Sequence, residues 1–125
     1  MKTATFCGQR TMHHDDVLKV KTELYLILEK LVNVGVDRFL IDDNGNFDIL
    51  CAEAVIELKR KYRQIELQMF SRPSVDTLKN ADILIKYIKA PRGLILEKTN
   101  YAKENNISIF DLPEILRKKY IPAQP

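Results

Sequence analysis

Segments typical of strands and segments typical of helices alternate along the whole chain, and this alternation limits the folds that the chain can adopt. Short apolar and β-branched runs predict strands at Thr3–Cys7, Val36–Ile41, Ile65–Phe70, Asp82–Ile88 and Ile107–Phe110. Helical spacing of apolar residues predicts a first helix that begins at Asp15 or Asp16 and ends before Gly35, and further helices at about Phe47–Lys61, Leu94–Glu104 and Pro113–Tyr120.

Helices that connect successive strands favour a parallel sheet with both faces covered. The sequence therefore predicts an α/β fold, a three-layer Rossmann-like, doubly wound parallel sheet of about five strands in the order 3-2-1-4-5. The chain has 125 residues, of which 46% are apolar, enough for one domain with one core. We expect residues 1–120 to form that single domain and residues 121–125 to be a C-terminal tail.

Charge and cysteine content narrow the class of protein further. Lys and Arg number 20 against 17 Asp and Glu, and a net charge of +3 does not predict a nucleic-acid-binding protein. Two cysteines are too few for a disulfide scaffold. No apolar run has the length of a membrane span, and the first ten residues contain no signal-peptide segment. These features predict a cytoplasmic domain without a membrane partner.

A ligand of such a fold would bind beyond the carboxyl ends of the strands, where the strand order reverses. Three segments are expected there, and each contains a glycine and polar residues: Gly8–Asp16, Asp42–Asn46 and Ala90–Gly93. This arrangement favours a small pocket for a nucleotide-like ligand. The alternative is that these loops are polar only because they are exposed to water.

Three segments carry a resemblance to a known family. They are Phe6–Arg10 (FCGQR), Phe39–Val55 (FLIDDNGNFDILCAEAV) and Ala81–Leu112, which includes Tyr87, Gly93 and Tyr101–Lys103. Their order and spacing resemble those of YpsA-like proteins in the SLOG superfamily, which also contains DprA-type and LOG-type domains. The resemblance covers most of the chain. It implies a Rossmann-like fold and a nucleotide-derived ligand.

The chain also differs from that family at defined positions. Asp42 and Asp43 stand where the family has a glycine pair, and Leu94 replaces a second glycine after Gly93. The carboxylates would repel a phosphate at the following helix N-terminus. Only about Ser71–Asn80 connects the third and fourth strands, so one wall of the pocket is missing or comes from a second subunit. We therefore expect a shortened, partly degenerate member that forms a homodimer.

Several residues are candidates for ligand contact, and most have a structural alternative. Arg10 could clamp an anion or pair with Asp42 or Asp43, and Gly8 could serve the turn alone. Asp48 could support the helix dipole, and Glu53 is a candidate through the resemblance. The predicted ligand-binding set is Gly8, Gln9, Arg10, Asp43, Asn44, Asn46, Asp48, Glu53 and Gly93.

Other polar residues favour structural roles. His13 and His14 lie in a segment expected to be a solvated loop, without a recognised metal spacing. The acidic and amide residues from Asp42 to Glu53 match part of a calcium loop, but Phe47 occupies its required glycine position, so a helix-capping turn is favoured. Cys51 is expected in the core, and Cys7 is a candidate reactive thiol near the pocket.

The sequence contains no recognisable nucleophile–base pair, P-loop or metal-ligand set, and Gly93–Glu97 lacks the LOG-type catalytic pattern. We therefore predict no catalytic residue, no metal and no resident cofactor. The leading hypothesis is a non-catalytic module that binds a nucleotide or nucleotide-derived ligand. The alternatives are a protein-interaction or regulatory domain that has lost ligand binding, and, more weakly, a hydrolase of a nucleotide derivative acting through Asp48 or Glu53.

Overall fold

The computed structural model of the chain describes residues 2–43, 45–71, 75–88 and 93–120. Five strands form: β1 (Lys2–Gly8), β2 (Val36–Asp42), β3 (Glu66–Phe70), β4 (Ile83–Tyr87) and β5 (Ser108–Asp111). The helices are α1 (His14–Asn33), α2 (Asn46–Lys61), α3 (Gly93–Glu104), α4 (Leu112–Tyr120) and the short 3-10 helix η1 (Val75–Leu78). The predicted alternation of strands and helices is thus confirmed, with boundaries that differ by one or two residues.

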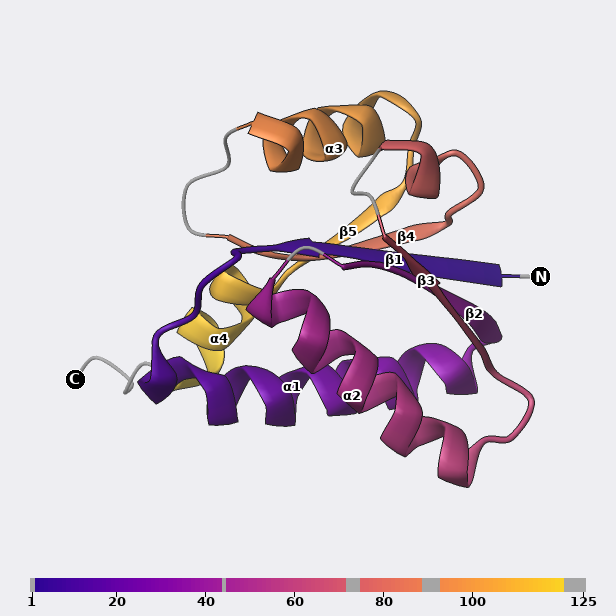
Figure 1. The fold of residues 1–125 in the computed structure, drawn as a ribbon, viewed down its shortest axis with the longest axis horizontal. Coiled ribbons are helices and arrows are strands. Elements are labelled where there is room, and N and C mark those ends of the chain that lie inside the picture. The colour runs from indigo at the N-terminus through magenta and orange to yellow at the C-terminus, as the bar shows by residue number, and fades with distance from the viewer. Residues whose placement is uncertain (1, 44, 72–74, 89–92, 121–125) are drawn as a thin grey trace.

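All five strands belong to one sheet in the order β3-β2-β1-β4-β5, and every pairing is parallel. This is the predicted doubly wound order, so the Rossmann-like α/β architecture is confirmed. Figure 1 shows the three layers, with α1, α2 and α4 below the sheet and α3 with η1 above it. The order reverses between β1 and β4, and the carboxyl ends of β1, β2 and β4 meet at one edge of the sheet.

Most of the core lies between the sheet and the layer of α1, α2 and α4. The helical stripe of α1 supplies Val20, Leu24, Ile27, Leu28 and Leu31, all buried, because residues three and four apart share a helix face. Strand residues such as Phe6, Phe39 and Ile85 meet it from the sheet, each fully buried. A smaller core on the opposite face, beneath α3, contains Cys7, Leu78, Leu84 and Ala102.

The α1 helix begins differently from the prediction. His13, rather than Asp15 or Asp16, is the N-cap residue, and its Nδ1 accepts a hydrogen bond of 3.2 Å from the Asp15 backbone amide. The two aspartates lie in the first turn, where negative charge complements the helix dipole. At the other end Gly35 has φ of +105°, in accord with the left-handed conformation expected after the helix.

The connection between β3 and β4 is short, as predicted, and it contains η1, which the sequence pattern did not indicate. Residues 72–74 of this connection, including Pro73, lie outside the described residues. Only η1 therefore stands where a doubly wound fold usually carries a full crossover helix. Within the described part of the chain, no helix is long and apolar enough to cross a bilayer.

Candidate functional site

A small pocket lies at the edge where the carboxyl ends of β1 and β2 face α3. It is lined by Phe6, Cys7, Gly8, Asp42, Asp48, Leu94, Ile95 and Lys98. Its enclosed space is about 10 Å³, close to the least that one water molecule needs. The pocket can therefore take a single hydroxyl-sized or amino-sized group, and the remainder of any ligand would lie outside it.

An ion pair between Asp42 and Lys98 forms the floor of this pocket. Asp42 ends β2, Lys98 projects from the second turn of α3, and each side chain is only 3% exposed. The Lys98 ammonium donates to Oδ2 of Asp42. The other oxygen of Asp42, Oδ1, is buried and has no hydrogen-bond partner among the described residues. The pair thus leaves one buried acceptor site open.

Cys7 lies among four charged groups. Lys98, Lys86, Asp48 and Asp42 all act on its thiol electrostatically. Burial is the largest influence, and it raises the pKa of Cys7 from 9.0 to about 12 despite the two lysines. Because only a thiolate is nucleophilic, burial and the raised pKa disfavour a reaction of Cys7 near neutral pH and count against our interpretation of it as a candidate reactive thiol. Cys51 is buried in the main core, as expected.

Lys86 is a second buried cation at this edge. It lies near the end of β4, is 8% exposed, and takes part in no hydrogen bond or ion pair with the described residues. Its register neighbours are Cys7 on β1 and Asp111 on β5, which share its face of the sheet. Oδ1 of Asp111 is also buried without a hydrogen-bond partner in the described chain. Buried carboxylate oxygens of Asp42 and Asp111 therefore have no hydrogen-bond partner among the described residues near the crossover point.

The first two loops at this edge are bonded to each other through the start of α2. The Asn46 amide donates to the Arg10 carbonyl at 2.8 Å, and the Phe47 amide donates to the Gln9 carbonyl at 3.5 Å. Gly45 has φ of +123°, and a Cβ there would lie 2.5 Å from Cα of Arg10. Two amides at this helix N-terminus are thus bonded to the first loop and are not free to bind a phosphate.

The structure distributes the predicted ligand-binding residues unequally around the pocket. Gly8 and Asp48 line it, and Asp48 is 5% exposed. Gly8 also makes room for packing, because a Cβ there would lie 2.2 Å from the ring of Phe47. Four more lie in or beside the first two loops but do not line the pocket: Gln9, Arg10, Asp43 and Asn46.

The remaining predicted ligand-binding residues do not line the pocket or lie outside the residues that the structure describes. Glu53 is exposed on α2, beyond its first turn, and does not line the pocket. Gly93 is the exposed first residue of α3. Asn44 lies outside the described residues, as do residues 89–92 of the third loop. The alternative in which Arg10 pairs with Asp42 is not observed, because Asp42 pairs with Lys98.

Sequence reasoning missed Lys98 and Lys86 as site residues. The position of each lysine in the sequence pattern could have indicated that its side chain is buried. Lys98 lies four residues after Leu94 and four before Ala102, so it continues the inward face of α3. Lys86 interrupts the apolar run of β4, in a strand that the topology places inside a parallel sheet. A charge at such a position needs a partner or a ligand.

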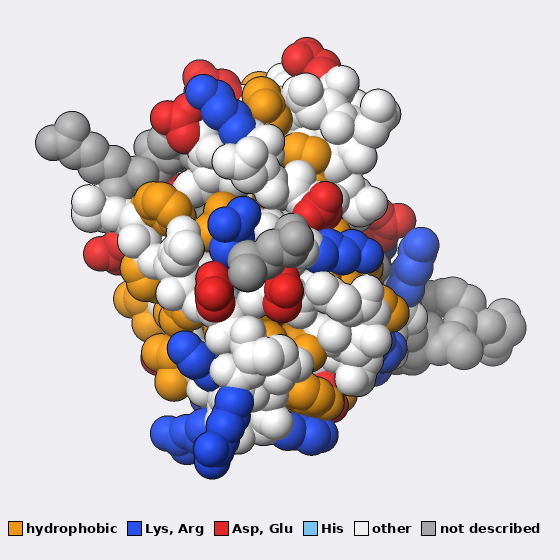
Figure 2. All heavy atoms as spheres, turned by 90° about the vertical axis from the view of Figure 1, so that its right-hand side faces the viewer, with side chains coloured by type: hydrophobic (Ala, Val, Ile, Leu, Met, Phe, Trp, Pro, Cys, Tyr) orange, Lys and Arg blue, Asp and Glu red, His pale blue; other side chains and the backbone are white. Residues whose placement is uncertain are grey.

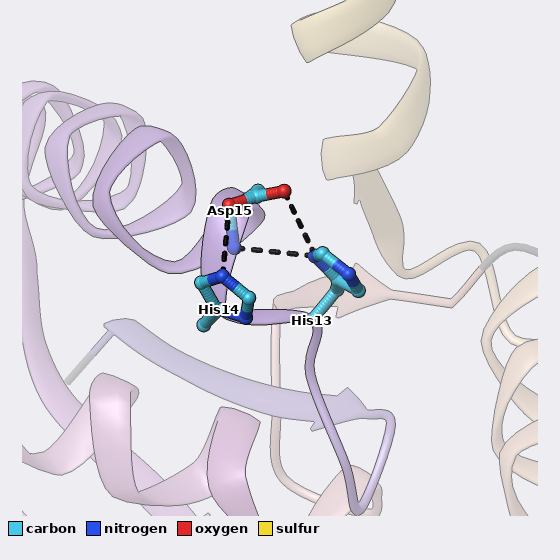
Figure 3. A group of neighbouring side chains, drawn as sticks. All are labelled: His13, His14 and Asp15. Atoms are coloured by element: carbon cyan, nitrogen blue, oxygen red, sulfur yellow. Dashed lines mark hydrogen bonds and ion pairs between the residues drawn. The ribbon is translucent and has the colours of Figure 1, made fainter.

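His13, His14 and Asp15 form an exposed cluster at the start of α1 (Figure 3), and their potential ligand atoms lie within 4.8 Å of one another. Nδ1 of His13 already accepts from the Asp15 amide. The positive pole of α1 also disfavours a cation at this position. We therefore interpret the cluster as a helix cap, and His13 and His14 remain solvated, as the sequence predicted.

Basic side chains gather at the far edge of the molecule, away from the pocket. Figure 2 shows them at the bottom of that face, over the carboxyl end of α2. The last turn of α2 contains Lys59, Arg60 and Lys61, and Lys61 pairs with Glu29 of α1 at 2.8 Å. Cations at a helix carboxyl end complement its dipole. We therefore interpret these residues as a solvated helix end.

Comparison of the chain with models of protein families and with curated protein sequences finds no match.

Proposed function

We propose that the protein is a non-catalytic Rossmann-like module that binds a nucleotide or nucleotide-derived ligand at the carboxyl edge of its sheet. The observation that carries the proposal is the buried Asp42–Lys98 pair, which leaves Oδ1 of Asp42 without a hydrogen-bond partner among the described residues. Leaving a buried polar group unsatisfied costs ~1–3 kcal/mol. A ligand that supplies the missing partners would recover that free energy on binding.

The chemistry of these groups favours a ribose or a base at the pocket. Asp42 presents a buried acceptor, and hydroxyl or amino groups of a nucleoside are donors. The enclosed space of about 10 Å³ fits one such group. The rest of the ligand would lie along the loops that carry Gln9, Arg10, Asp43 and Asn46.

An anionic part of the ligand would have to lie away from the start of α2. The Asn46 and Phe47 amides are bonded to the first loop, and Asp42, Asp43 and Asp48 concentrate negative charge there. Lys86 is a cation that forms no ion pair with the described residues, and Arg10 is exposed at the same edge. We infer that one of these two groups contacts the anionic part, and that a nucleoside or a sugar-linked derivative fits better than a bare phosphate.

The resemblance of Phe6–Arg10 and Phe39–Val55 to YpsA-like proteins of the SLOG superfamily supports the same proposal. In this interpretation the chain is a shortened relative whose acidic second loop replaces a phosphate-binding turn. A reaction at this site is not part of the proposal. Burial keeps the pKa of Cys7 near 12, and Glu53 is exposed outside the pocket.

Thermal denaturation with and without ligand tests the proposal. The panel comprises adenosine, ADP-ribose, NAD, ATP, a cyclic nucleotide and inorganic phosphate. We expect at least one nucleoside-containing member to raise the melting temperature, and phosphate to raise it less. Mass spectrometry of the native protein as purified would identify any ligand it retains.

Variants show whether such a shift comes from this site. Either Lys86→Met or Arg10→Met should reduce the shift, whereas Lys61→Met, at the exposed carboxyl end of α2, should preserve it. If no panel member raises the melting temperature and nothing co-purifies, the ligand-binding proposal is wrong. Equal shifts in wild type, Lys86→Met and Arg10→Met would place the binding site elsewhere.

A further inference from the structure

An apolar groove lies on the outer surface of the helical layer, far from the proposed ligand pocket. It runs between α1 and α2 and has a volume of about 310 Å³. Leu18, Tyr25 and Leu26 of α1 form one wall, and Ala54 of α2 contributes to the other.

Two leucines of this groove are exposed to water. Leu18 is 73% exposed and Leu26 is 39% exposed. Burying a leucine side chain contributes ~1.5–3 kcal/mol relative to leaving it exposed. The inward stripe of α1 is already complete without these two residues. They therefore add nothing to the core of a single chain, and they favour coverage by a second molecule.

Two opposite charges flank the groove. Lys21 lies on the α1 wall and Glu57 on the α2 wall. Neither residue forms an ion pair within the described part of the chain. Elsewhere the same two helices do form such pairs, as Glu29 of α1 does with Lys61 of α2 at 2.8 Å. The groove therefore carries one unmatched charge of each sign on opposite sides of an apolar centre.

We propose that this groove is the interface of a homodimer whose twofold axis runs along the groove. Rotation about that axis places α1 of one copy against α2 of the other. Lys21 then faces Glu57 of the partner subunit, and the same pair forms a second time by symmetry. The exposed leucines meet at the centre, where water is excluded.

A second copy fits this surface better than an unrelated partner because the surface is complementary to itself. A twofold axis brings the positive wall onto the negative wall, whereas an acidic or basic partner would satisfy only one of them. The leucines supply an apolar centre and the charges supply a polar rim, as in stable interfaces. This inference is independent of ligand binding at the sheet edge.

Light scattering coupled to size-exclusion chromatography, across the micromolar concentration range, tests the proposal. We expect wild type to be a dimer. Lys21→Glu and Glu57→Lys should each shift the equilibrium to monomer, with dimerisation weakened about tenfold or more, because each places like charges together twice. Lys30→Glu and Lys59→Glu, exposed on the same helices outside the groove, serve as controls and should leave the dimer intact.

Mixing the two charge-reversal variants tests directly whether Lys21 pairs with Glu57 of the partner subunit. An equal mixture of Lys21→Glu and Glu57→Lys should form heterodimers, since each mixed interface contains one native pair and one reversed pair. Leu18→Glu should abolish dimers of either kind, and circular dichroism shows that each variant is folded. A monomeric wild type at the highest concentration overturns the proposal. So does a dimer that survives both Leu18→Glu and Lys21→Glu, because its interface would then lie elsewhere.

Discussion

Lys98 of α3 reaches across the end of β1 to pair with Asp42 at the end of β2, and both side chains are 3% exposed. The contact joins the helix above the sheet to the strand that follows α1 in the chain. It also holds α3, which contributes Leu94 and Ile95 to the pocket, against the end of the sheet. Breaking a buried pair by removing one partner is costly, because the other charge stays buried without compensation.

Lys98→Met should therefore lower the free energy of unfolding by ~3–5 kcal/mol, because it leaves Asp42 buried without its cation. Urea denaturation monitored by circular dichroism measures the change. Lys103→Met, at an exposed position of the same helix, is the control and should change stability by less than ~0.5 kcal/mol.

The double variant Asp42→Leu, Lys98→Met separates the charge effect from lost packing. It removes both charges at once, so it should be more stable than Lys98→Met alone. A double variant that is less stable than either single variant would mean that packing of the two side chains, rather than charge burial, dominates at this site.

Cys7 should resist alkylation in the folded protein near neutral pH and react once the protein is unfolded, since burial raises its pKa to about 12. The same shift makes stability depend on pH. Above pH 9.0 the unfolded thiol loses its proton, whereas the folded thiol keeps it until about pH 12. The free energy of unfolding should thus fall with rising pH in this window, by about 1.4 kcal/mol per pH unit for one thiol.

Cys7→Ala provides the comparison for that pH dependence. It lacks the titrating thiol, so its free energy of unfolding should fall less steeply than that of wild type above pH 9.0. The pKa of Cys51 is also raised by burial, and that contribution is present in both proteins. Parallel curves for the two proteins would show that the pKa of Cys7 does not differ between the folded and unfolded states.

The order and pairing of the strands could be predicted because the sequence repeats simple local patterns. The spacing of Val20, Leu24 and Leu31 indicates a helix with one buried face, and the apolar run Ile83–Tyr87 indicates a buried strand. Parallel strands then require crossovers of one hand, which leaves few arrangements of the sheet. The η1 helix was missed because one turn of 3-10 helix has too few residues to show a period.

The site could be predicted only at the level of the loops that form it. Local pattern correctly places Gly8 and Asp48 at the carboxyl edge of the sheet. Gly8 is the last residue of β1, and Asp48 lies in the first turn of α2, which follows β2. The Asp42–Lys98 pair joins residues 56 positions apart, and nothing in either local segment specifies the other. Its formation depends on how α3 packs over β1, which is a property of the assembled sheet.

His13→Ala should lower the free energy of unfolding by ~1 kcal/mol, because it removes the acceptor for the Asp15 amide at the start of α1. His13→Ser should retain most of the stability, since a serine hydroxyl can accept the same bond. His14→Ala is the matched control, because the His14 side chain is 88% exposed. Thermal melts would compare the three variants, and equal losses from the two alanine variants would argue against a cap at His13.

Gly45→Ala should be one of the most destabilising small substitutions in the chain, because it combines backbone strain with a close contact. Gly45 has φ of +123°, and a Cβ there would lie 2.5 Å from Cα of Arg10, in the backbone of the first loop. Gly35→Ala isolates the strain, since Gly35 has φ of +105° and no atom of the described residues lies within 4 Å of the new Cβ. We expect Gly35→Ala to cost ~1–3 kcal/mol in urea denaturation and Gly45→Ala to cost clearly more. The excess measures how tightly the two loops are joined at the ligand edge, and equal costs would mean that the first loop moves away freely.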